Sequence, residues 1–359
     1  MKMETKRRGV GVRLSGGVLL LSLSAMLGCE AMMGRIVDGA VDRQANSTRV
    51  ELLEDDALHV FLCGTGSPLA DADSAAACTM VIAGGKVYVI DVGPGSQEVA
   101  QLAGMPTRAL GGVFLTHFHS DHIGELGEWA TQSWIAGRTG PFIVYGPPGV
   151  DRVVGGFKEA YRQDDEYRIA HHDIENLPRT ATEWVPHTVP YETGPGTKVL
   201  DEGGLVVTAF AVDHKPVEPA VGYRFDYKGR SVVISGDTDK SSNLESIAKG
   251  ADLLIHEVLV KRLIAQVSDA LGEAGEPRLQ RLSSDILDYH TSPSEAAESA
   301  NAAGVDTLVF THLVPPVPGP LREWLFMRDV EAGDVDVMLG EDGMMFRLPV
   351  GSDSIEIDS

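Results

Sequence analysis

Residues 116 to 122 place several metal-ligating side chains in one short loop after an apolar run, and they read Thr116-His117-Phe118-His119-Ser120-Asp121-His122. Side chains two apart in extended backbone point the same way, so His117 and His119 can bind one ion, while Asp121 and His122 can turn to a second. Imidazole and carboxylate are ligands of borderline cations such as zinc, and no nearby thiolate could complete a closed structural site. The spacing predicts an open, water-bearing metal centre rather than a surface histidine cluster at a helix start.

Three later positions could complete this centre. Taken alone, His214 among polar neighbours would be an ordinary surface histidine, and Asp237 after an apolar run would be a turn residue. His312 follows the short β-rich run Thr307–Phe310, so its side chain should emerge at a strand end. Their order along the chain, after the first cluster, favours a shared site.

The motifs in this order resemble those of the metallo-β-lactamase superfamily, whose signature is His-x-His-x-Asp-His after a strand. The resemblance extends from about Leu58 to the C-terminus. It implies two metal sites and a bridging carboxylate: His117, His119 and His214 for the first metal, Asp121, His122 and His312 for the second, and Asp237 between them.

Two turns belong to the same resemblance. Asp91 in the turn Asp91–Gly95 would orient neighbouring ligands, the alternative being a solvated turn aspartate. Gly64–Pro68 is better interpreted as a tight turn beneath the metals than as a nucleotide loop, because no Gly-Lys-Ser/Thr follows.

Two further motifs, Asp252–Glu257 and His290–Ser292, resemble a pair in ribonuclease Z and its exported, arylsulfatase-like relatives. The resemblance implies that His290 is a general acid and that Glu257 keeps its imidazole charged and correctly oriented. The predicted catalytic residues are Asp121, His290 and Glu257. Without the motif, His290 would be a loop histidine and Glu257 an acid at a helix N-terminus. His256 is predicted to be structural, because it has the opposite strand orientation.

A pair of dications about 3.5 to 4 Å apart would lower the pKa of a bridging water and neutralise oxyanion charge, so hydrolysis is the predicted reaction. We expect two Zn²⁺, although the same ligands accept iron or manganese. Asp237, where some relatives have cysteine, argues by resemblance against the β-lactam-cleaving branch. Phosphoester, sulfoester, thioester and lactone hydrolysis remain open.

Departures from ribonuclease Z favour an arylsulfatase-like hydrolase of small sulfate or phosphate esters. Only Asp226–Ile234 separates the motifs between which bacterial ribonuclease Z carries its tRNA-clasping arm, and Leu313–Pro316 lacks the usual Arg-Tyr. A net charge of -22 makes a nucleic-acid partner unexpected. The alternatives are a ribonuclease Z-like phosphodiesterase (a tRNA 3′-processing endonuclease), a lactonase and a non-catalytic metal-binding surface lipoprotein. The oligomeric state is open, a dimer included.

The N-terminus has the layout of an export signal over residues 1–29. Basic residues precede an apolar stretch from about Val18 to Leu27, which is shorter than the roughly 20 residues of a spanning helix. Ala25–Cys29 resembles a lipobox, so Cys29 would be lipidated and residues 30–49 would be a tether to the membrane; a cleaved signal or a short anchor is the alternative. We expect a periplasmic or cell-surface protein that meets the membrane through this lipid only.

Residues 50–359 read as one α/β domain with two similar halves. The predicted fold, which the resemblance also implies, is a four-layer αβ/βα sandwich with the metal loops at one sheet edge. The segment 156–197 could be a lid over the metals or a surface elaboration. Cys63 and Cys78 could form a disulfide or remain as buried thiols. Strands are expected at 58–63, 79–82, 87–90, 142–145, 205–212, 221–227, 231–234 and 253–255, and helices at 97–103, 126–135, 243–249, 258–271 and 293–303.

Overall fold

A computed structural model of the chain describes residues 37, 47–317 and 319–358. The predicted export signal, Cys29 and most of the predicted tether lie outside these residues. Residues Arg49–Ser359 form one structural unit, to which the following description applies. Within the described part of the chain, no helix combines the length and hydrophobicity needed to cross a bilayer.

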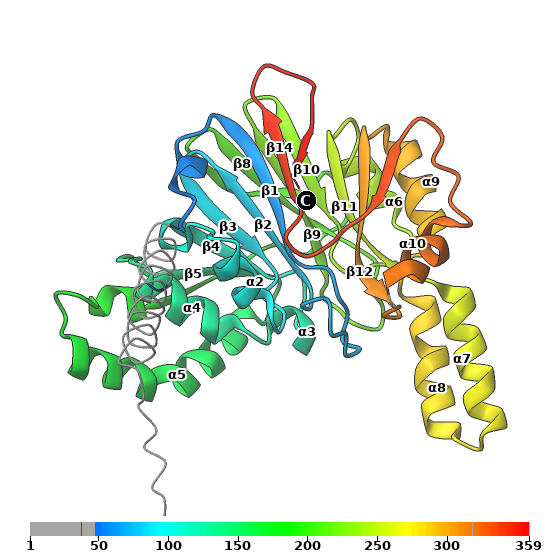
Figure 1. Cartoon of the computed structure of the whole chain (residues 1–359), viewed down its shortest axis with the longest axis horizontal. Helices are drawn as coiled ribbons and strands as arrows, with labels where there is room; N and C mark the ends of the chain where they lie inside the picture. Colours follow the sequence, from blue (N-terminus) through cyan, green and yellow to red (C-terminus); the bar gives the residue numbers. More distant parts are fainter. Residues whose placement is uncertain (1–36, 38–46, 318, 359) are drawn as a thin grey trace, which may run out of the picture. The chain divides into compact units, whose positions relative to one another are not determined.

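Two mixed β-sheets form the centre of this unit (Figure 1). The first sheet has the order β15-β14-β1-β2-β3-β4-β5-β6. Its strands are β1 (Ala57–Gly64), β2 (Cys78–Ala83), β3 (Lys86–Ile90), β4 (Leu110–Phe114), β5 (Phe142–Gly146), β6 (Trp184–Thr188), β14 (Met345–Pro349) and β15 (Glu356–Asp358).

The second sheet has the order β13-β12-β11-β10-β9-β8-β7. Its strands are β7 (Thr197–Glu202), β8 (Leu205–Ala211), β9 (Val221–Tyr227), β10 (Arg230–Ile234), β11 (Leu253–Leu259), β12 (Thr307–Val314) and β13 (Asp336–Leu339). Strands β10, β11, β12 and β13 pair in parallel, so their C-terminal ends meet at one edge.

Side chains from both sheets meet in a shared core. Phe114 of the first sheet packs against Tyr223 and Phe225 of the second, with ring centroids 5.2 and 5.5 Å apart. Each such aromatic pair adds about 0.5 to 1.5 kcal/mol beyond the area that it buries. Because inward and outward residues alternate along each strand, the sheet faces that carry these rings are the faces that pack together.

Helices cover the outer face of each sheet. Apolar side chains of α2 (Ser96–Leu102), α4 (Leu126–Ile135) and α5 (Val150–His172) join the outer core of the first sheet. Those of α6 (Ser242–Ile247), α9 (Pro293–Ala303) and α10 (Gly319–Met327) join that of the second. The remaining short helices are α3 (Ser120–Ile123), η1 (Val50–Leu53), η2 (Thr107–Ala109), η3 (Arg179–Thr182) and η4 (Ile286–Asp288). The predicted four-layer αβ/βα sandwich is confirmed.

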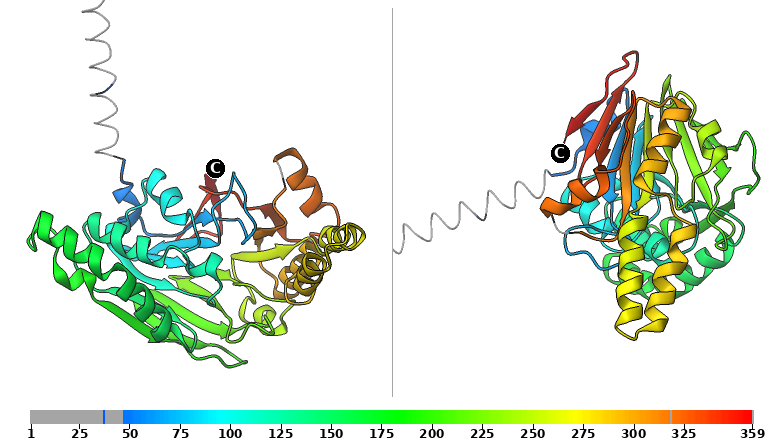
Figure 2. Two further views of the ribbon diagram at one scale, coloured as in Figure 1. Left: turned by 90° about the horizontal axis from the view of Figure 1, so that it is seen from below. Right: turned by 90° about the vertical axis from the view of Figure 1, so that its right-hand side faces the viewer.

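The helix expected over Val258–Leu271 was placed wrongly at its start. Strand β11 continues to Leu259, because Val258 and Leu259 pair with Leu313 and Val314 of β12. The helix that follows, α7 (Lys261–Glu273), packs against α8 (Pro277–Asp285), which was not predicted. Figure 2 shows this α7–α8 hairpin projecting from the sheets.

Two local features of the sequence are present in the structure. Ser292 caps α9 and exchanges hydrogen bonds with Glu295, forming the capping box that the sequence pattern indicates. Cys63 and Cys78, on neighbouring strands β1 and β2, form a disulfide, which settles the alternative left open by the sequence.

Candidate metal centre

The loop after β4 delivers the first four candidate ligands. Strand β4 is hydrogen-bonded in parallel to β3 and β5, so the chain leaves it at the same edge as its neighbours. His117 is fully buried beyond this edge and His119 is half-buried at the N-cap of α3. The single turn of α3 then turns Asp121 and His122 inward, where both are buried.

The second sheet delivers the other three candidates at the same edge. His214 follows β8 and Asp237 follows β10, each within three residues of the strand's end. Both side chains are almost fully buried, and His312 joins them from within β12.

His312 reaches the site through a β-bulge, which the sequence did not reveal. Glu257 pairs with Thr311 and Val258 pairs with Leu313, so His312 is the extra residue in the register. Its φ of 47° lies in the left-handed region, which is uncommon for a residue with a Cβ. A bulge turns a side chain away from the regular alternation of the strand, and here it directs an imidazole toward Asp121.

The predicted ligand residues converge as two groups. The nearest ligand atoms of His117, His119, His214 and Asp237 lie within 4.8 Å of one another, as do those of Asp121, His122 and His312. Asp237 lies between the groups, because its Oδ2 atom is 3.3 Å from His122 Nε2 and 3.8 Å from His117 Nε2. This is the arrangement that a bridging carboxylate between a pair of cations requires.

Hydrogen bonds to the other ring nitrogen orient three of the imidazoles. His122 Nδ1 is 2.7 Å from Asp91 Oδ2, His214 Nδ1 is 2.9 Å from the carbonyl oxygen of Tyr289, and His117 Nδ1 is 3.1 Å from Thr116 Oγ1. Because Nδ1–H donates in each case, Nε2 presents a lone pair to the centre.

The centre therefore contains buried acceptors without donors. Among the described residues, Nε2 of His117, His122 and His214 and Oδ1 of Asp237 are buried and have no hydrogen-bond partner. Burial also lowers the pKa of His117 and of His214, which favours the neutral form that ligates metals, whereas at His122 the carboxylates of Asp237 and Asp91 outweigh burial and raise the pKa. Such a set of nitrogen and oxygen lone pairs fits divalent cations of the zinc type. The residues form a buried His/Asp metal site suited to two ions.

Glu257 and His290 also meet beside this centre. His290 Nδ1 is 2.8 Å from Glu257 Oε1, and the His290 ring lies 5.2 Å from the ring of His214 and 5.7 Å from that of His312. The same carboxylate oxygen accepts from the backbone N–H of Thr238. Burial alone would lower the pKa of His290, but Glu257 outweighs it and raises the pKa to about 9. The geometry can supply a proton at the rim of the metal site.

His256, predicted to be structural, is buried, and its Nδ1 lies 2.7 Å from the carbonyl oxygen of Glu257. It is absent from the groups of candidate ligands within the described chain.

Sequence reasoning missed several supporting residues. Thr116 donates through N and Oγ1 to Asp91, which fixes the carboxylate that orients His122. Asp342 accepts hydrogen bonds from Thr65 and from the backbone N–H of Ala75, and so holds the Gly64–Pro68 turn. That turn contacts β12 next to His312, because Leu313 N–H donates to Thr65 O. The sequence signal that could have identified Asp342 is its position in a glycine-rich turn, Gly340–Gly343.

The segment 156–197 is partly integral to the fold. Its helical parts belong to α5 and η3, and Trp184–Thr188 is the edge strand β6 of the first sheet. Beyond β6, Tyr191 Oη donates to Glu218 in the loop after His214. Its closure over the metals stays a prediction.

Comparisons with known proteins agree with this site. A family model described as the beta-lactamase superfamily domain matches residues 87–313. A ribonuclease Z of Mycobacterium bovis is 38% identical over 286 residues, covering 78% of this chain and 95% of that protein. A ribonuclease Z of Mycolicibacterium paratuberculosis is 40% identical over 290 residues, covering 79% and 96%.

Solved structures agree on the fold. The short form of human tRNase Z superimposes with a TM-score of 0.55 at 20% identity, covering 81% of this chain and 99% of that one. The metallo-β-lactamase fold protein YhfI of Bacillus subtilis gives a TM-score of 0.55 at 19% identity, covering 82% and 100%.

These relatives change which of the two expected functions, arylsulfatase-like or ribonuclease Z-like, is favoured. The preference for an arylsulfatase-like enzyme rested on the missing arm and the missing Arg-Tyr, yet the similarity over nearly the whole length of ribonuclease Z relatives favours the alternative. Net charge was a poor guide, because it sums over the whole surface and does not describe the edge around the metals. The exclusion of nucleic acid is therefore withdrawn.

The contact between Asp91 and His122 generates a test of the metal centre. Asp91→Asn keeps the side-chain size but removes the charge that orients His122, so we expect zinc affinity to fall by about 10 to 100-fold. Competition with a chromophoric chelator measures this change. Asp213→Asn is the matched control, because Asp213 lies beside His214 but its exposed carboxylate reaches Lys215 instead, at 3.9 Å. Equal affinity in both variants would contradict the role of Asp91.

Proposed function

This chain belongs to the β-lactamase superfamily, in its ribonuclease Z branch, and from that premise we propose that it is a dinuclear zinc phosphodiesterase that cleaves RNA near a 3′ end. It is a metal-dependent hydrolase, and the finer assignment of metal and substrate is the proposal. The observation that supports it is the similarity to ribonuclease Z over nearly the whole length of those relatives. His290 supplies the general acid that the reaction needs, because its ring lies 5.2 Å from that of His214 and 5.7 Å from that of His312 while Glu257 holds its Nδ1.

Separate groups of residues would hold the two cations used in phosphodiester hydrolysis. His117, His119 and His214 would hold one cation, Asp121, His122 and His312 the other, and Asp237 would bridge them. When bound, the two cations supply hydroxide at neutral pH and neutralise charge on the phosphoryl oxygens. Asp91 and the Tyr289 carbonyl fix the imidazole tautomers that make this binding possible.

His290 completes the reaction on the leaving-group side. Its Nδ1–H donates to Glu257, so Nε2–H is the proton available to the departing ribose oxygen. The carboxylate of Glu257 stabilises the imidazolium before transfer and keeps the ring in one orientation. An alkoxide leaving group needs such an acid, because it would otherwise depart as a strong base.

A second candidate, hydrolysis of a small sulfate or phosphate ester outside the cytoplasm, is favoured by two features. The N-terminal residues resemble an export signal with a lipobox at Cys29, and the Cys63–Cys78 disulfide is of a kind that persists in oxidising compartments. A ribonuclease acting there would meet RNA that is not a tRNA precursor.

A substrate panel tests the proposed reaction. The zinc-loaded protein should hydrolyse bis-p-nitrophenyl phosphate and an RNA with a 3′ extension, and should leave p-nitrophenyl sulfate and an acyl lactone intact. Release of p-nitrophenol and sizing of the RNA on a gel are the measurements. Turnover of the sulfate ester, or of bis-p-nitrophenyl phosphate without cleavage of the RNA, would select the second candidate, and full zinc binding without turnover would contradict both.

The His290–Glu257 pair gives a prediction about pH. Because the acid form of His290 persists up to its pKa of about 9, kcat should fall as pH rises beyond that value. His290→Ala should lower kcat by about 10² to 10⁴-fold without releasing zinc. Glu257→Gln removes the charge that raises the pKa, so the alkaline limb should move to lower pH. Loss of zinc from His290→Ala, or an unmoved limb in Glu257→Gln, would make the pair structural.

Export also has a direct test. In a bacterial host, the full chain should appear in the membrane fraction and incorporate radiolabelled palmitate, and Cys29→Ala should abolish both. Recovery of the unaltered chain from the cytoplasm alone would refute the export proposal.

A further inference from the structure

The turn that carries Asp342 joins the two sheets, because it runs from β13 of the second sheet to β14 of the first. At its start, Gly340 N–H donates to the carbonyl oxygen of Phe310 in β12. At its end, Gly343 N–H donates to the carbonyl oxygen of Leu62 in β1. A Cβ on Gly340 would lie 2.8 Å from Leu62 Cδ1 and from the Phe310 oxygen, so the turn is packed tightly against both strands.

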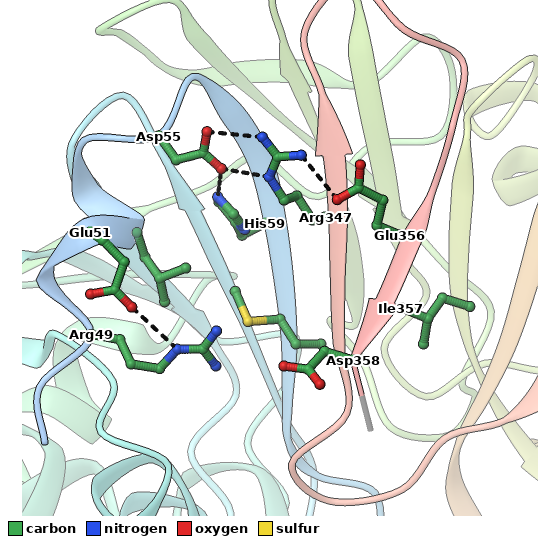
Figure 3. A pocket seen from close by; sticks show the side chains of 10 residues that line it. Arg49, Glu51, Asp55, His59, Arg347, Glu356, Ile357 and Asp358 are labelled. Atoms are coloured by element: carbon green, nitrogen blue, oxygen red, sulfur yellow. Dashed lines mark hydrogen bonds and ion pairs between the residues drawn. The ribbon is translucent and has the colours of Figure 1, made fainter.

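Strand β14, which follows this turn, is also held to its neighbours further along (Figure 3). Arg347 donates to Asp55 at 2.7 and 3.1 Å and to Glu356 of β15 at 3.0 Å. His59 of β1 contacts the same aspartate, with Nε2 2.9 Å from Oδ2. None of the predicted metal ligands is among the side chains that line the pocket at this place. The carboxylate of Asp55 therefore stabilises β14 away from the metal centre.

Asp342 uses both carboxylate oxygens to hold the two sides of the β1–β2 loop, residues 65–77. Oδ1 accepts hydrogen bonds from N and Oγ1 of Thr65, at 2.8 and 2.7 Å. Oδ2 accepts from the backbone N–H of Ala75 at 2.6 Å, on the other side of the loop. The disulfide between β1 and β2 closes the loop just outside these contacts. The positions of both sides of the loop thus depend on one carboxylate.

The first side of the loop supports His312. Thr65 O accepts from the backbone N–H of Leu313 at 2.9 Å. Leu313 follows His312 directly, at the β-bulge where the φ of His312 is 47°. Because left-handed backbone is unfavourable for a residue with a Cβ, it persists only where its surroundings hold it. Asp342 therefore reaches one metal ligand through Thr65.

The second side of the loop supports Asp121 and His122. Gly93 N–H donates to the carbonyl oxygen of Ala77, on this side of the loop, at 3.0 Å. A Cβ on Gly93 would clash with the carbonyl oxygen of Asp121, so the two backbones are in close contact. Val92 N–H, one residue earlier, donates to His122 O at 2.7 Å. The turn at Gly93 thus connects the loop to the backbone of both ligands.

These contacts reach one group of candidate ligands and not the other. The second-metal group is Asp121, His122 and His312, and the first-metal group is His117, His119 and His214. Among the described residues, no hydrogen bond joins the β1–β2 loop to the first-metal group. We propose that Asp342 is a positioning residue for the second metal, acting through the β1–β2 loop on all three of its ligands. This inference rests on the dinuclear centre of the proposed function.

Asp342→Asn tests the proposal, because an amide has one acceptor oxygen and turns N–H donors toward one side of the loop. The metal-free full chain is titrated with Zn²⁺ in competition with a chromophoric chelator. The unaltered chain should bind zinc in two steps. In Asp342→Asn, the step of the second-metal group should weaken by about tenfold, at the low end of the loss for residues that orient ligands. The other step should stay within about twofold.

Ligand variants assign the two steps, and a matched variant controls for stability. His312→Ala should weaken mainly the second-metal step, and His119→Ala mainly the first-metal step. Asp55→Asn makes the same change in the other carboxylate that holds β14, so it should lower the melting temperature. It should leave both zinc steps within about twofold, as changes at distant sites do. A general weakening of β14 is thereby separated from the positioning of ligands.

Equal weakening of both steps in Asp342→Asn, or an unchanged second-metal step, would overturn the proposal. If circular dichroism shows that this variant is unfolded, Thr65→Val decides, because it removes only the Oγ1 donor. It should weaken the second-metal step by about threefold, the effect of one hydrogen bond, and unchanged affinity would overturn the proposal. A single zinc step in the unaltered chain would refute the dinuclear centre itself, whereas two steps without a selective loss would refute only the role of Asp342.

Discussion

The structure depends on one cluster of buried nitrogen and oxygen lone pairs that have no hydrogen-bond donor. Three imidazole nitrogens and a carboxylate oxygen are buried at one sheet edge without a donor. In an apolar interior such a set is strongly unfavourable, and a cation is the partner that satisfies all of its members together. Metal binding should therefore stabilise the fold as well as enable the reaction, because the ligands come from both sheets.

The sandwich brings these residues together by its topology. Ligands after β4, β8 and β10 and within β12 belong to separate parts of the sequence, but the strands place them at one edge. The supporting hydrogen bonds are local and rigid: Asp91 is tied to Thr116, and the Tyr289 carbonyl lies next to His290 in the chain. The residue that orients a metal ligand is thus adjacent to the proposed acid, which couples the two parts of the site.

Much of this was predictable from the sequence because the motifs are local and ordered. The His-x-His-x-Asp-His loop, the later single ligands and the capping box at Ser292 each carry their own pattern, and the structure places the ligand candidates in one cluster. The bulge at His312 was not predictable, since it exists only in the pairing of β12 with β11. The extension of β11 and the helix α8 were missed for a similar reason, because partners distant in sequence override local preference. The contacts of Asp342 with Thr65 and Ala75 were not predictable either, because they join residues 277 and 267 positions apart in the chain.

The α7–α8 hairpin begins a few residues after Glu257 and ends shortly before His290, so it is bracketed by the two halves of the proton-donating pair. Every predicted metal ligand lies outside this interval. Changes in the length or surface of the hairpin would leave the positions of the metal ligands in the chain unaltered, and they would fall between the two members of the acid pair. Descendants of one ancestral hydrolase could in this way differ in the leaving groups that they accept and keep the same metal ligands.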